Sequence, residues 1–141
     1  MTSLSFPDVN VWLALILEHH VHRTSALKWW KNTDGTIAFT RLTQLGTLRL
    51  LTTAAAMDRH PVTMGQAWQA YDRLFQDERI SLYPEPAGFE MRFRRLSQSP
   101  AASPKVWADA YLVAFAEGHR GRLVTFDRAL QNRGADCLVL D

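Results

Sequence analysis

The sequence predicts an α/β fold in which helices cover a parallel β-sheet. Short apolar segments alternate with longer segments of helical periodicity, the pattern of strands joined by helical crossovers. Two of the short segments lead directly into aspartates, Asp8 and Asp127. Ligands of such sheets bind beyond the carboxyl ends of the strands, so we expect both carboxylates at the functional edge.

Size and composition favour one compact domain over residues 1–141. Of the 141 residues 47% are hydrophobic, enough for a continuous core. Lysine and arginine total 16 against 14 acidic residues, and this net charge of +2 neither requires nor excludes a nucleic-acid partner. The one cysteine, Cys137, cannot form an internal disulfide or a cysteine metal cage, so we expect a small core side chain.

We expect a cytoplasmic protein without a membrane segment. The N-terminus has no basic region followed by a small-residue cleavage site. Residues 9–17 are apolar, but this segment is short and contains Asn10, so it is interpreted as a buried helix.

The first half of the chain predicts two strands and four helices. The expected strands are residues 3–6 and 36–39, and the expected helices are residues 9–18, 24–31, 40–52 and 63–75. The second helix is expected to bury Ala26, Trp29 and Trp30. The inward side chains expected of the third helix are Leu42, Leu45, Leu48 and Leu51 or Thr52. Those expected of the fourth helix, capped by Thr63, are Ala67, Trp68, Tyr71 and Leu74.

The second half predicts three further strands and three helices. The strands are expected at residues 79–83, 123–127 and 137–140, and the outer helices at residues 88–96 and 128–132. The helix between them contains the sequence WADAYLVAFA, residues 107–116. Ser103 and Pro104 form a favourable cap and first turn for it.

This last helix turns a carboxylate toward the protein interior. Four of its residues share one face: Val106, Asp109, Val113 and Ala116. A buried carboxylate requires a proton, a cation or hydrogen-bond donors. Asp109 reaches the ends of the strands if its helix begins there. Asp8, Asp109 and Asp127 together therefore predict one cation site.

Carboxylate oxygens suit Mg²⁺ or Mn²⁺, ions that polarise a phosphate and lower the pKa of a bound water. Each aspartate alone has a structural explanation of at least equal weight, with Asp8 and Asp127 as helix caps and Asp109 in a salt bridge. Together, in an α/β pattern, they favour the site. The histidines within residues 19–22 lack further ligands and are interpreted as a solvated helix end.

Basic and aromatic residues supply candidate nucleic-acid contacts. Arg41 and Arg49 lie on the helix after the second strand and are candidates for backbone phosphates. For the arginines within residues 92–95, phosphate binding and a solvated face have equal weight. Trp107 precedes Asp109 by two residues and either stacks on a base or packs in the core, and we favour the core.

Four segments combine these features: FPDVNVWLAL (residues 6–15), TRLTQLGTLRLLT (40–52), WADAYL (107–112) and LVTFD (123–127). In this order and at these separations the chain resembles a PIN-domain protein, and specifically a VapC-type toxin ribonuclease of a type II toxin–antitoxin system. The resemblance covers essentially the whole chain. Each motif alone is common, whereas the four together are fairly specific.

The resemblance implies a PIN-like three-layer α/β/α sandwich with a small parallel sheet. It implies an Mg²⁺- or Mn²⁺-dependent endoribonuclease in which water attacks a phosphodiester in line. Asp8, Asp109 and Asp127 match three acidic positions of the family, where Asp8 and Asp109 hold the metal and Asp127 completes the acidic pocket. The implied partners are an RNA substrate, a cognate VapB-type antitoxin that occludes the site, and a second copy in a homodimer.

The chain departs from the family at the second acidic position. Many members carry a glutamate on the helix after the second strand, and the matching residue here is Gln44 or Gly46, depending on register. The amide oxygen of Gln44 can hold a metal-bound water, but it is neutral and cannot act as a base. We therefore expect weaker metal binding, or binding completed by RNA phosphate oxygens.

Three functions remain in view. The three aspartates favour a metal-dependent endoribonuclease, the toxin of a toxin–antitoxin pair. The missing glutamate favours the alternative, a catalytically inactive PIN-like domain that binds RNA or a protein partner. A metal-dependent phosphatase has less support, because Asn10 stands where such an enzyme would need a second aspartate as general acid.

Overall fold

Five parallel strands form the centre of the fold in the computed structural model, which describes residues 3–141. The strands are β1 (Leu4–Pro7), β2 (Thr36–Phe39), β3 (Ile80–Leu82), β4 (Arg122–Thr125) and β5 (Asp136–Val139). Their order across the sheet is β3-β2-β1-β4-β5, and every neighbouring pair is parallel. All strands therefore end at the same edge of the sheet.

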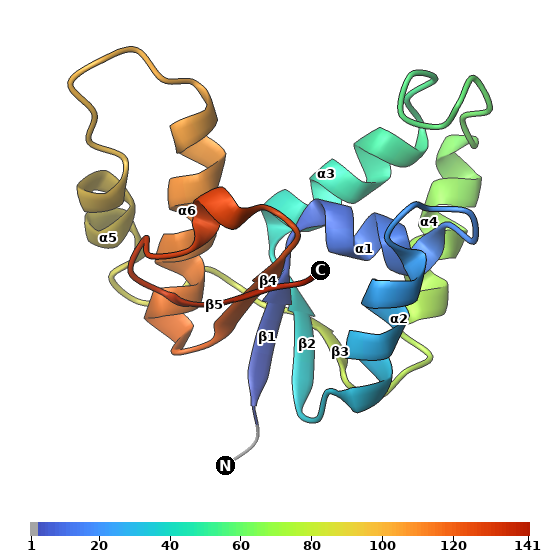
Figure 1. Ribbon diagram of the computed structural model, residues 1–141, viewed down its shortest axis with the longest axis horizontal. Helices are drawn as coiled ribbons and strands as arrows, with labels where there is room; N and C mark the ends of the chain where they lie inside the picture. Colours follow the sequence, from blue (N-terminus) through green and yellow to red (C-terminus); the bar gives the residue numbers. More distant parts are fainter. Residues whose placement is uncertain (1–2) are drawn as a thin grey trace.

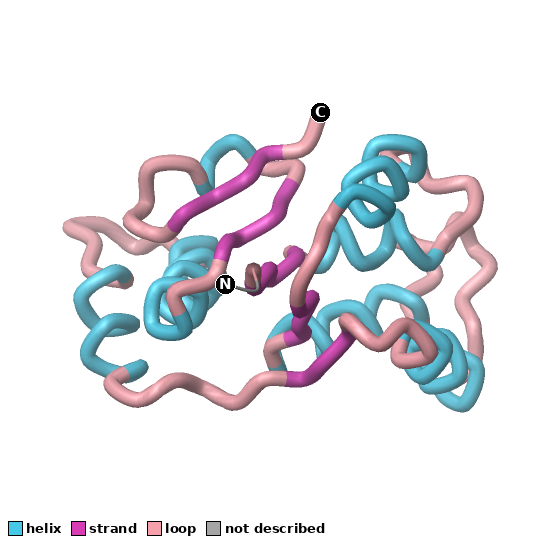
Figure 2. Tube along the Cα trace, turned by 90° about the horizontal axis from the view of Figure 1, so that it is seen from below, coloured by secondary structure: helices cyan, strands magenta, loops and turns pink. Residues whose placement is uncertain are grey.

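Six α-helices and one 3₁₀ helix connect the strands within residues 3–141. They are α1 (Val9–Ile16), α2 (Arg23–Asn32), α3 (Arg41–Leu51), α4 (Met64–Leu74), α5 (Phe89–Leu96), α6 (Lys105–His119) and η1 (Arg128–Leu130). Helices α5 and α6 lie on one side of the sheet, and α1 to α4 lie on the other (Figures 1 and 2). This arrangement confirms the predicted three-layer α/β/α fold.

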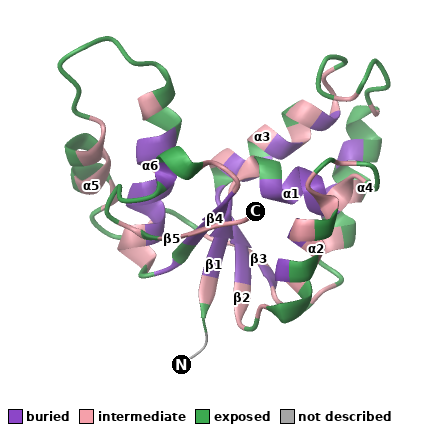
Figure 3. Ribbon diagram, viewed as in Figure 1, coloured by how far each residue is buried: buried purple, intermediate pink, exposed green. Residues whose placement is uncertain are grey.

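Both faces of the central strands β2, β1 and β4 are buried, because successive strand residues point to opposite faces and both faces carry helices (Figure 3). In β2, Ile37 and Phe39 join the core cluster beneath α1, α2 and α4, while Ala38 joins the cluster beneath α5 and α6. In β4, Val124 belongs to the first cluster and Leu123 to the second. The short apolar runs of the sequence thus become central strands.

Two residues expected on the buried faces of α3 and α4 are exposed instead. Leu45 on α3 is 60% exposed, and Trp68 on α4 is 47% exposed. Leucines spaced by three residues drift around a helix of 3.6 residues per turn, so the set predicted for α3 cannot share one face. Leu51 of α3 and Ala67 of α4 are buried together against α1.

Helix α6 begins without the predicted serine cap. Pro104 occupies the N-cap position with helical backbone angles, and no side chain caps this end. The first backbone bond is from the Val106 N–H to the Ser103 carbonyl, at 3.0 Å. Ser103 therefore acts through its backbone, because Pro104 already has the helical conformation.

Two smaller expectations concern the ends of the fold. Cys137 in β5 is half-buried and packs against the cluster beneath α5 and α6, as a small core side chain does. None of the helices in residues 3–141 combines the length and apolar character that a membrane crossing requires.

We expect Phe39→Ala to lower the free energy of unfolding by about 3–5 kcal/mol. Phe39 is fully buried and stacks on Trp12 with ring centroids 3.7 Å apart, so truncation removes this contact and leaves a cavity between β2 and α1. The control is Met91→Ala on α5, where the side chain is 79% exposed and the change should stay within about 0.5 kcal/mol. Equilibrium urea unfolding measures both, and equal losses would contradict this description of the core.

Candidate active site

Asp8 lies directly beyond the central strand β1. Its N–H donates to the Val124 carbonyl at 2.8 Å, which extends the pairing of β1 with β4 by one residue. Its Oδ1 accepts from the Val9 N–H at 2.7 Å, so Asp8 caps α1. Its Oδ2 accepts from the Thr125 hydroxyl at 3.2 Å. One carboxylate oxygen thus caps the N-terminus of α1, and the other contacts the last residue of β4.

Asp127 lies two residues beyond β4, at the same edge. Its Oδ1 accepts from the Ala129 N–H at 2.9 Å and caps η1. Its Oδ2 forms an ion pair with Lys105 Nζ at 3.3 Å, and Lys105 is the first residue of α6. Asp8 and Asp127 therefore both cap helices, as considered from the sequence, and both lie at the same edge of the sheet.

Thr125 is a site residue that the sequence reasoning missed. Its hydroxyl donates to Asp8 Oδ2 and accepts from the Asp127 N–H at 3.0 Å, so one side chain links both carboxylates. Thr125 is the buried last residue of β4. A polar residue at the end of an apolar strand, two positions before Asp127, was the available signal.

Asp109 reaches this edge from α6. The helix starts where Lys105 meets Asp127 and then runs beside the sheet, so Asp109 lies in its second turn (Figure 1). Asp109 is only 9% exposed, and Val113 and Ala116 are buried as predicted for its face. Within residues 3–141 no hydrogen bond or ion pair involves the Asp109 carboxylate. The salt bridge considered from sequence is therefore not formed there.

The pKa directions show that the three carboxylates interact. Burial raises the pKa of Asp8, and the nearby charges of Asp109 and Asp127 raise it further. Burial also raises the pKa of Asp109, while the charges of Lys105 and Arg133 oppose that shift. The pKa of Asp127 is lowered, chiefly by the hydrogen bond from the Ala129 backbone. Two carboxylates with raised pKa values thus lie near one whose pKa is lowered.

The described residues do not form a complete metal cage. Residues 3–141 contain no group of three or more histidine, cysteine, aspartate or glutamate side chains placed to hold one metal ion. The unpartnered Asp109 carboxylate and Asp8 Oδ2 nevertheless fit a hard cation. Mg²⁺ commonly binds through one or two carboxylates and keeps water or phosphate oxygens as its other ligands.

Gln44 and Gly46, the two candidates for the missing glutamate position, differ in their surroundings. A Cβ atom at Gly46 would lie 2.8 Å from Cγ2 of Val9, so this position serves the close approach of α3 to α1. Gln44 is buried, and its Oε1 accepts from Arg41 Nη1 at 2.8 Å. Gln44 is therefore a buried polar residue of α3 whose amide is restrained by Arg41.

The other basic candidates have different environments. Arg41 and Arg49 are exposed on α3. Arg92 and Arg95 both pair with Glu117 of α6, at 2.7 Å and 2.6 Å. These two arginines therefore fasten α5 to α6 instead of forming only a solvated face.

Two further expectations can be compared with the structure: Trp107 in the core, and the histidines within residues 19–22 as a solvated helix end. Trp107 is 60% exposed, so the expectation that it packs in the core is wrong. The buried face of α6 is occupied by Asp109, Val113 and Ala116, and a residue two positions from Asp109 points to the other side of the helix. His22 stacks on Phe126 with centroids 4.3 Å apart.

Asp8→Asn and Asp127→Asn should change stability in opposite directions at neutral pH without added metal. The raised pKa of Asp8 makes its ionised form a cost above that pKa, so Asp8→Asn should raise the free energy of unfolding. This gain disappears as pH falls through the raised pKa. The lowered pKa of Asp127 means that the fold favours its ionised form, so Asp127→Asn should destabilise until pH falls through the lowered pKa.

Urea unfolding of the two variants and the natural chain, from neutral pH to about pH 3, measures these differences. Changes of the same sign for both variants at neutral pH would contradict the assigned environments.

Proteins of one family match the chain over almost its whole length. The family model described as PIN domain matches residues 5–135. Ribonuclease VapC41 of Mycobacterium tuberculosis is 41% identical over 133 residues, 90% of this chain and 91% of the relative. The crystal structure of Mycobacterium tuberculosis VapC20, described as a Sarcin-Ricin loop cleaving toxin, has a TM-score of 0.69 at 17% identity. That match covers 93% of this chain and 95% of VapC20.

A second solved structure shows the same fold in a complex. VapBC2 from Rickettsia felis, bound to a DNA fragment from its promoter, has a TM-score of 0.62 at 13% identity and covers 98% of this chain and 99% of that chain. The extent of the family match and the identity to VapC41 go beyond a shared fold. With its acidic positions on the ends of β1 and β4 and on α6, the chain belongs to the PIN-domain family.

Proposed function

We propose that this protein is a metal-dependent endoribonuclease that hydrolyses RNA phosphodiester bonds as the toxin of a type II toxin–antitoxin pair. The observation that carries the proposal is the buried Asp109 carboxylate, which has no partner within residues 3–141 and interacts electrostatically with Asp8 and Asp127. The ribonuclease name of VapC41 and the loop-cleaving description of VapC20 support the reaction class.

Each aspartate has a distinct proposed role. Asp8 and Asp109 would hold Mg²⁺ or Mn²⁺, which when bound polarises the scissile phosphate and lowers the pKa of the attacking water. Thr125 orients Asp8 Oδ2, the oxygen that does not cap α1, by its hydrogen bond. Asp127 stays ionised because its pKa is lowered, and it keeps the edge negative. Burial raises the pKa of Asp109, and the charges of Lys105 and Arg133 oppose that rise, which favours the ionised form that a metal needs.

Helix α3 supplies the proposed contacts to the RNA backbone. Arg41 donates one N–H to Gln44 and has further donors for a phosphate, since a guanidinium carries five. Arg49 lies two turns further along the exposed face of α3. Gln44 would stand beside the metal without a charge, so the site has one negative charge fewer than a four-carboxylate site.

We also propose a VapB-type antitoxin and a homodimer as partners. VapBC2 and FitAB, structural neighbours with TM-scores of 0.62 and 0.64, are described as bound to DNA fragments. Apolar side chains exposed on α3 and α4 support a protein partner on this surface: Leu45, Met64 and Trp68.

The alternative function is a catalytically inactive PIN-like domain that binds RNA or a protein. One observation favours it: where many family members have a glutamate this chain has Gln44 or Gly46, and neither residue carries a carboxylate. Loss of that carboxylate removes a potential base and one negative charge. The retained aspartates of the other three acidic positions favour the enzyme.

Asp109→Asn and Asp8→Asn should each reduce RNA cleavage by on the order of 100-fold or more, because each removes a proposed metal ligand. The matched control is Asp72→Asn, an exposed aspartate on α4, which should cleave like the natural chain. Cleavage of labelled RNA with Mg²⁺ or Mn²⁺, its loss on addition of EDTA, and growth arrest on induced expression are the measurements.

The natural chain is the decisive sample in this experiment. If it cuts no RNA with either metal and its expression leaves growth unchanged, the enzyme proposal is wrong and the binding alternative stands.

Gln44→Glu should lower the Mg²⁺ concentration for half-maximal cleavage by about 10-fold, because it adds a carboxylate near the proposed metal. The control is Gln66→Glu in the cap of α4, which changes the net charge equally at a distant helix end. A titration of cleavage rate against Mg²⁺ separates the two variants. An unchanged Mg²⁺ requirement for Gln44→Glu would show that residue 44 does not act on the metal.

A further inference from the structure

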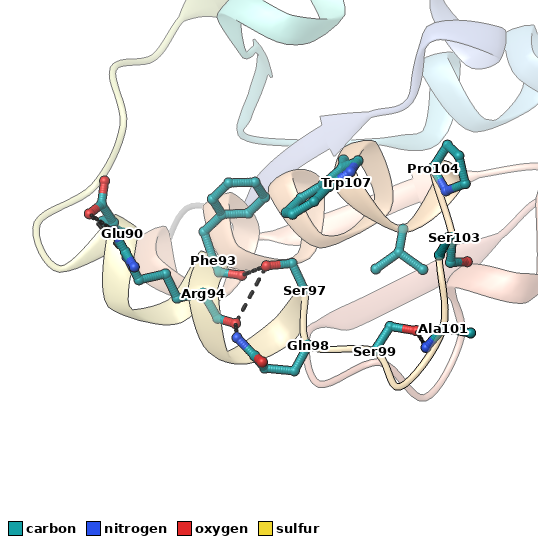
Figure 4. Close-up of a pocket in the computed structure, with 12 residues that line it drawn as sticks. Glu90, Phe93, Arg94, Ser97, Gln98, Ser99, Ala101, Ser103, Pro104 and Trp107 are labelled. Atoms are coloured by element: carbon teal, nitrogen blue, oxygen red, sulfur yellow. Dashed lines mark hydrogen bonds and ion pairs between the residues drawn. The ribbon is translucent and has the colours of Figure 1, made fainter.

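Trp107 lines a cavity that the proposed cleavage chemistry leaves unused. The cavity, about 710 Å³, lies between α5, residues 97–104 and the start of α6 (Figure 4). We propose that it binds an unpaired base of the RNA, stacked on the Trp107 indole, and so contributes to the choice of cleavage site. The inference rests on the proposed ribonuclease function.

The Trp107 indole is supported on its inner side and open on its outer side. Its ring lies 6.1 Å from that of Phe93, with the planes inclined by 56°. Phe93 in turn packs against Tyr111 and Phe89 on the way to the core. Figure 4 shows Phe93 and Trp107 side by side, with the loop of residues 97–104 curving around the other side of the cavity. A supported and exposed indole is a stacking platform.

The lining of the cavity suits a nucleobase better than an apolar peptide. Six of its twelve lining residues have polar side chains: Glu90, Arg94, Ser97, Gln98, Ser99 and Ser103. Gln98 donates its amide to the Arg94 carbonyl at 2.9 Å and presents its amide oxygen as an acceptor. A base offers a flat face for stacking and an edge of donors and acceptors, and this cavity offers the complement of both.

A second cavity, between α3 and α4, has the opposite character. Its seven lining residues are mostly apolar, and they include the exposed Leu45, Met64 and Trp68. That composition is typical of a protein contact, as proposed above for this surface. The polar and aromatic cavity beside α6 therefore has a different occupant.

Charge also favours RNA at the α5–α6 cavity. Residues 89–107 contain four basic residues and the single acid Glu90. Arg92 and Arg95 pair with Glu117 and Lys105 pairs with Asp127, so Arg94 is the basic residue that lines the cavity. Arg94 pairs with Glu90 on the surface, where both side chains are about three-quarters exposed. Such exposed pairs contribute little, so Arg94 can exchange its partner for a phosphate.

The cavity and Asp109 share helix α6. Trp107 and Asp109 are about 3 Å apart along the helix axis, at a rise of 1.5 Å per residue, and their side chains point to different sides. An RNA that contacts both residues must pass over the N-terminal end of α6. A single strand with a splayed base can follow this path, and such bases are the usual targets of sequence-specific RNA recognition.

Binding of RNA without cleavage tests the stacking directly. Labelled single-stranded oligonucleotides of A, C and U are titrated in EDTA against the natural chain, Trp107→Ala and Trp107→Phe. The control is Trp68→Ala, a second exposed tryptophan on α4. We expect Trp107→Ala to weaken binding roughly 5- to 150-fold, Trp107→Phe to retain most of it, and Trp68→Ala to match the natural chain. An abasic oligonucleotide should bind the natural chain and Trp107→Ala equally.

Kinetics with a metal supply the second measurement. Trp107→Ala should raise KM more than it lowers kcat and should relax the preference among cleavage sites, while its melting temperature shows that the fold is intact. Unchanged RNA affinity, KM and cleavage sites in Trp107→Ala would overturn the inference while the ribonuclease proposal stands. Loss of affinity for a protein partner alone would assign the cavity to that partner and also overturn it.

The two proposals fail in distinguishable ways. RNA binding that depends on Trp107, in a protein that cuts no RNA with Mg²⁺ or Mn²⁺, would support the base site and reject the enzyme.

Discussion

The parallel pairing of β1 with β4 is the constraint on which the rest of the structure depends. It aligns Phe6 with Leu123 and continues through the bond from the Asp8 N–H to the Val124 carbonyl. Thr125 closes the pair by donating to Asp8, a residue 117 positions away in sequence. A shift of this pairing by one residue would move each side chain of β4 to the other face of the sheet and would separate the carboxylates. The core and the candidate site therefore share one set of backbone bonds.

The same edge of the sheet brings together carboxylates whose ionised forms are unfavourable there. The central strands are buried on both faces, so carboxylates at their ends lie partly out of water, and burial raises the pKa of Asp8 and Asp109. Hydrogen bonds from the Val9 N–H and the Thr125 hydroxyl offset only part of this cost at Asp8, and none is donated to Asp109 within residues 3–141. A fold selected only for stability would place neutral residues here. Destabilising charges kept in one place are typical of functional sites, where stability is lost in exchange for chemistry.

Helix α6 carries residues of both proposed sites, the metal site and the base-binding cavity. One face packs into the core through Val113 and Ala116 and carries Asp109 into the acidic edge. Its first residue, Lys105, pairs with Asp127 and fixes the start of the helix against the end of β4. The opposite face leaves Trp107 exposed over the α5–α6 cavity. One rigid helix can thus position metal chemistry and base selection relative to each other, because the helix fixes the distance between them.

The sequence by itself determined the α/β class and the placement of Asp8 and Asp127 at strand ends, because these follow from local periodicity and from the rule that parallel strands share an edge. It also showed that Asp109 lies on the apolar face of its helix. Only the tertiary structure decided that Trp107 is exposed and that Thr125 bridges two aspartates. Periodicity identifies the face of a helix that is apolar, but which side another element covers depends on contacts between residues far apart in the chain, and these are set only when the sheet assembles.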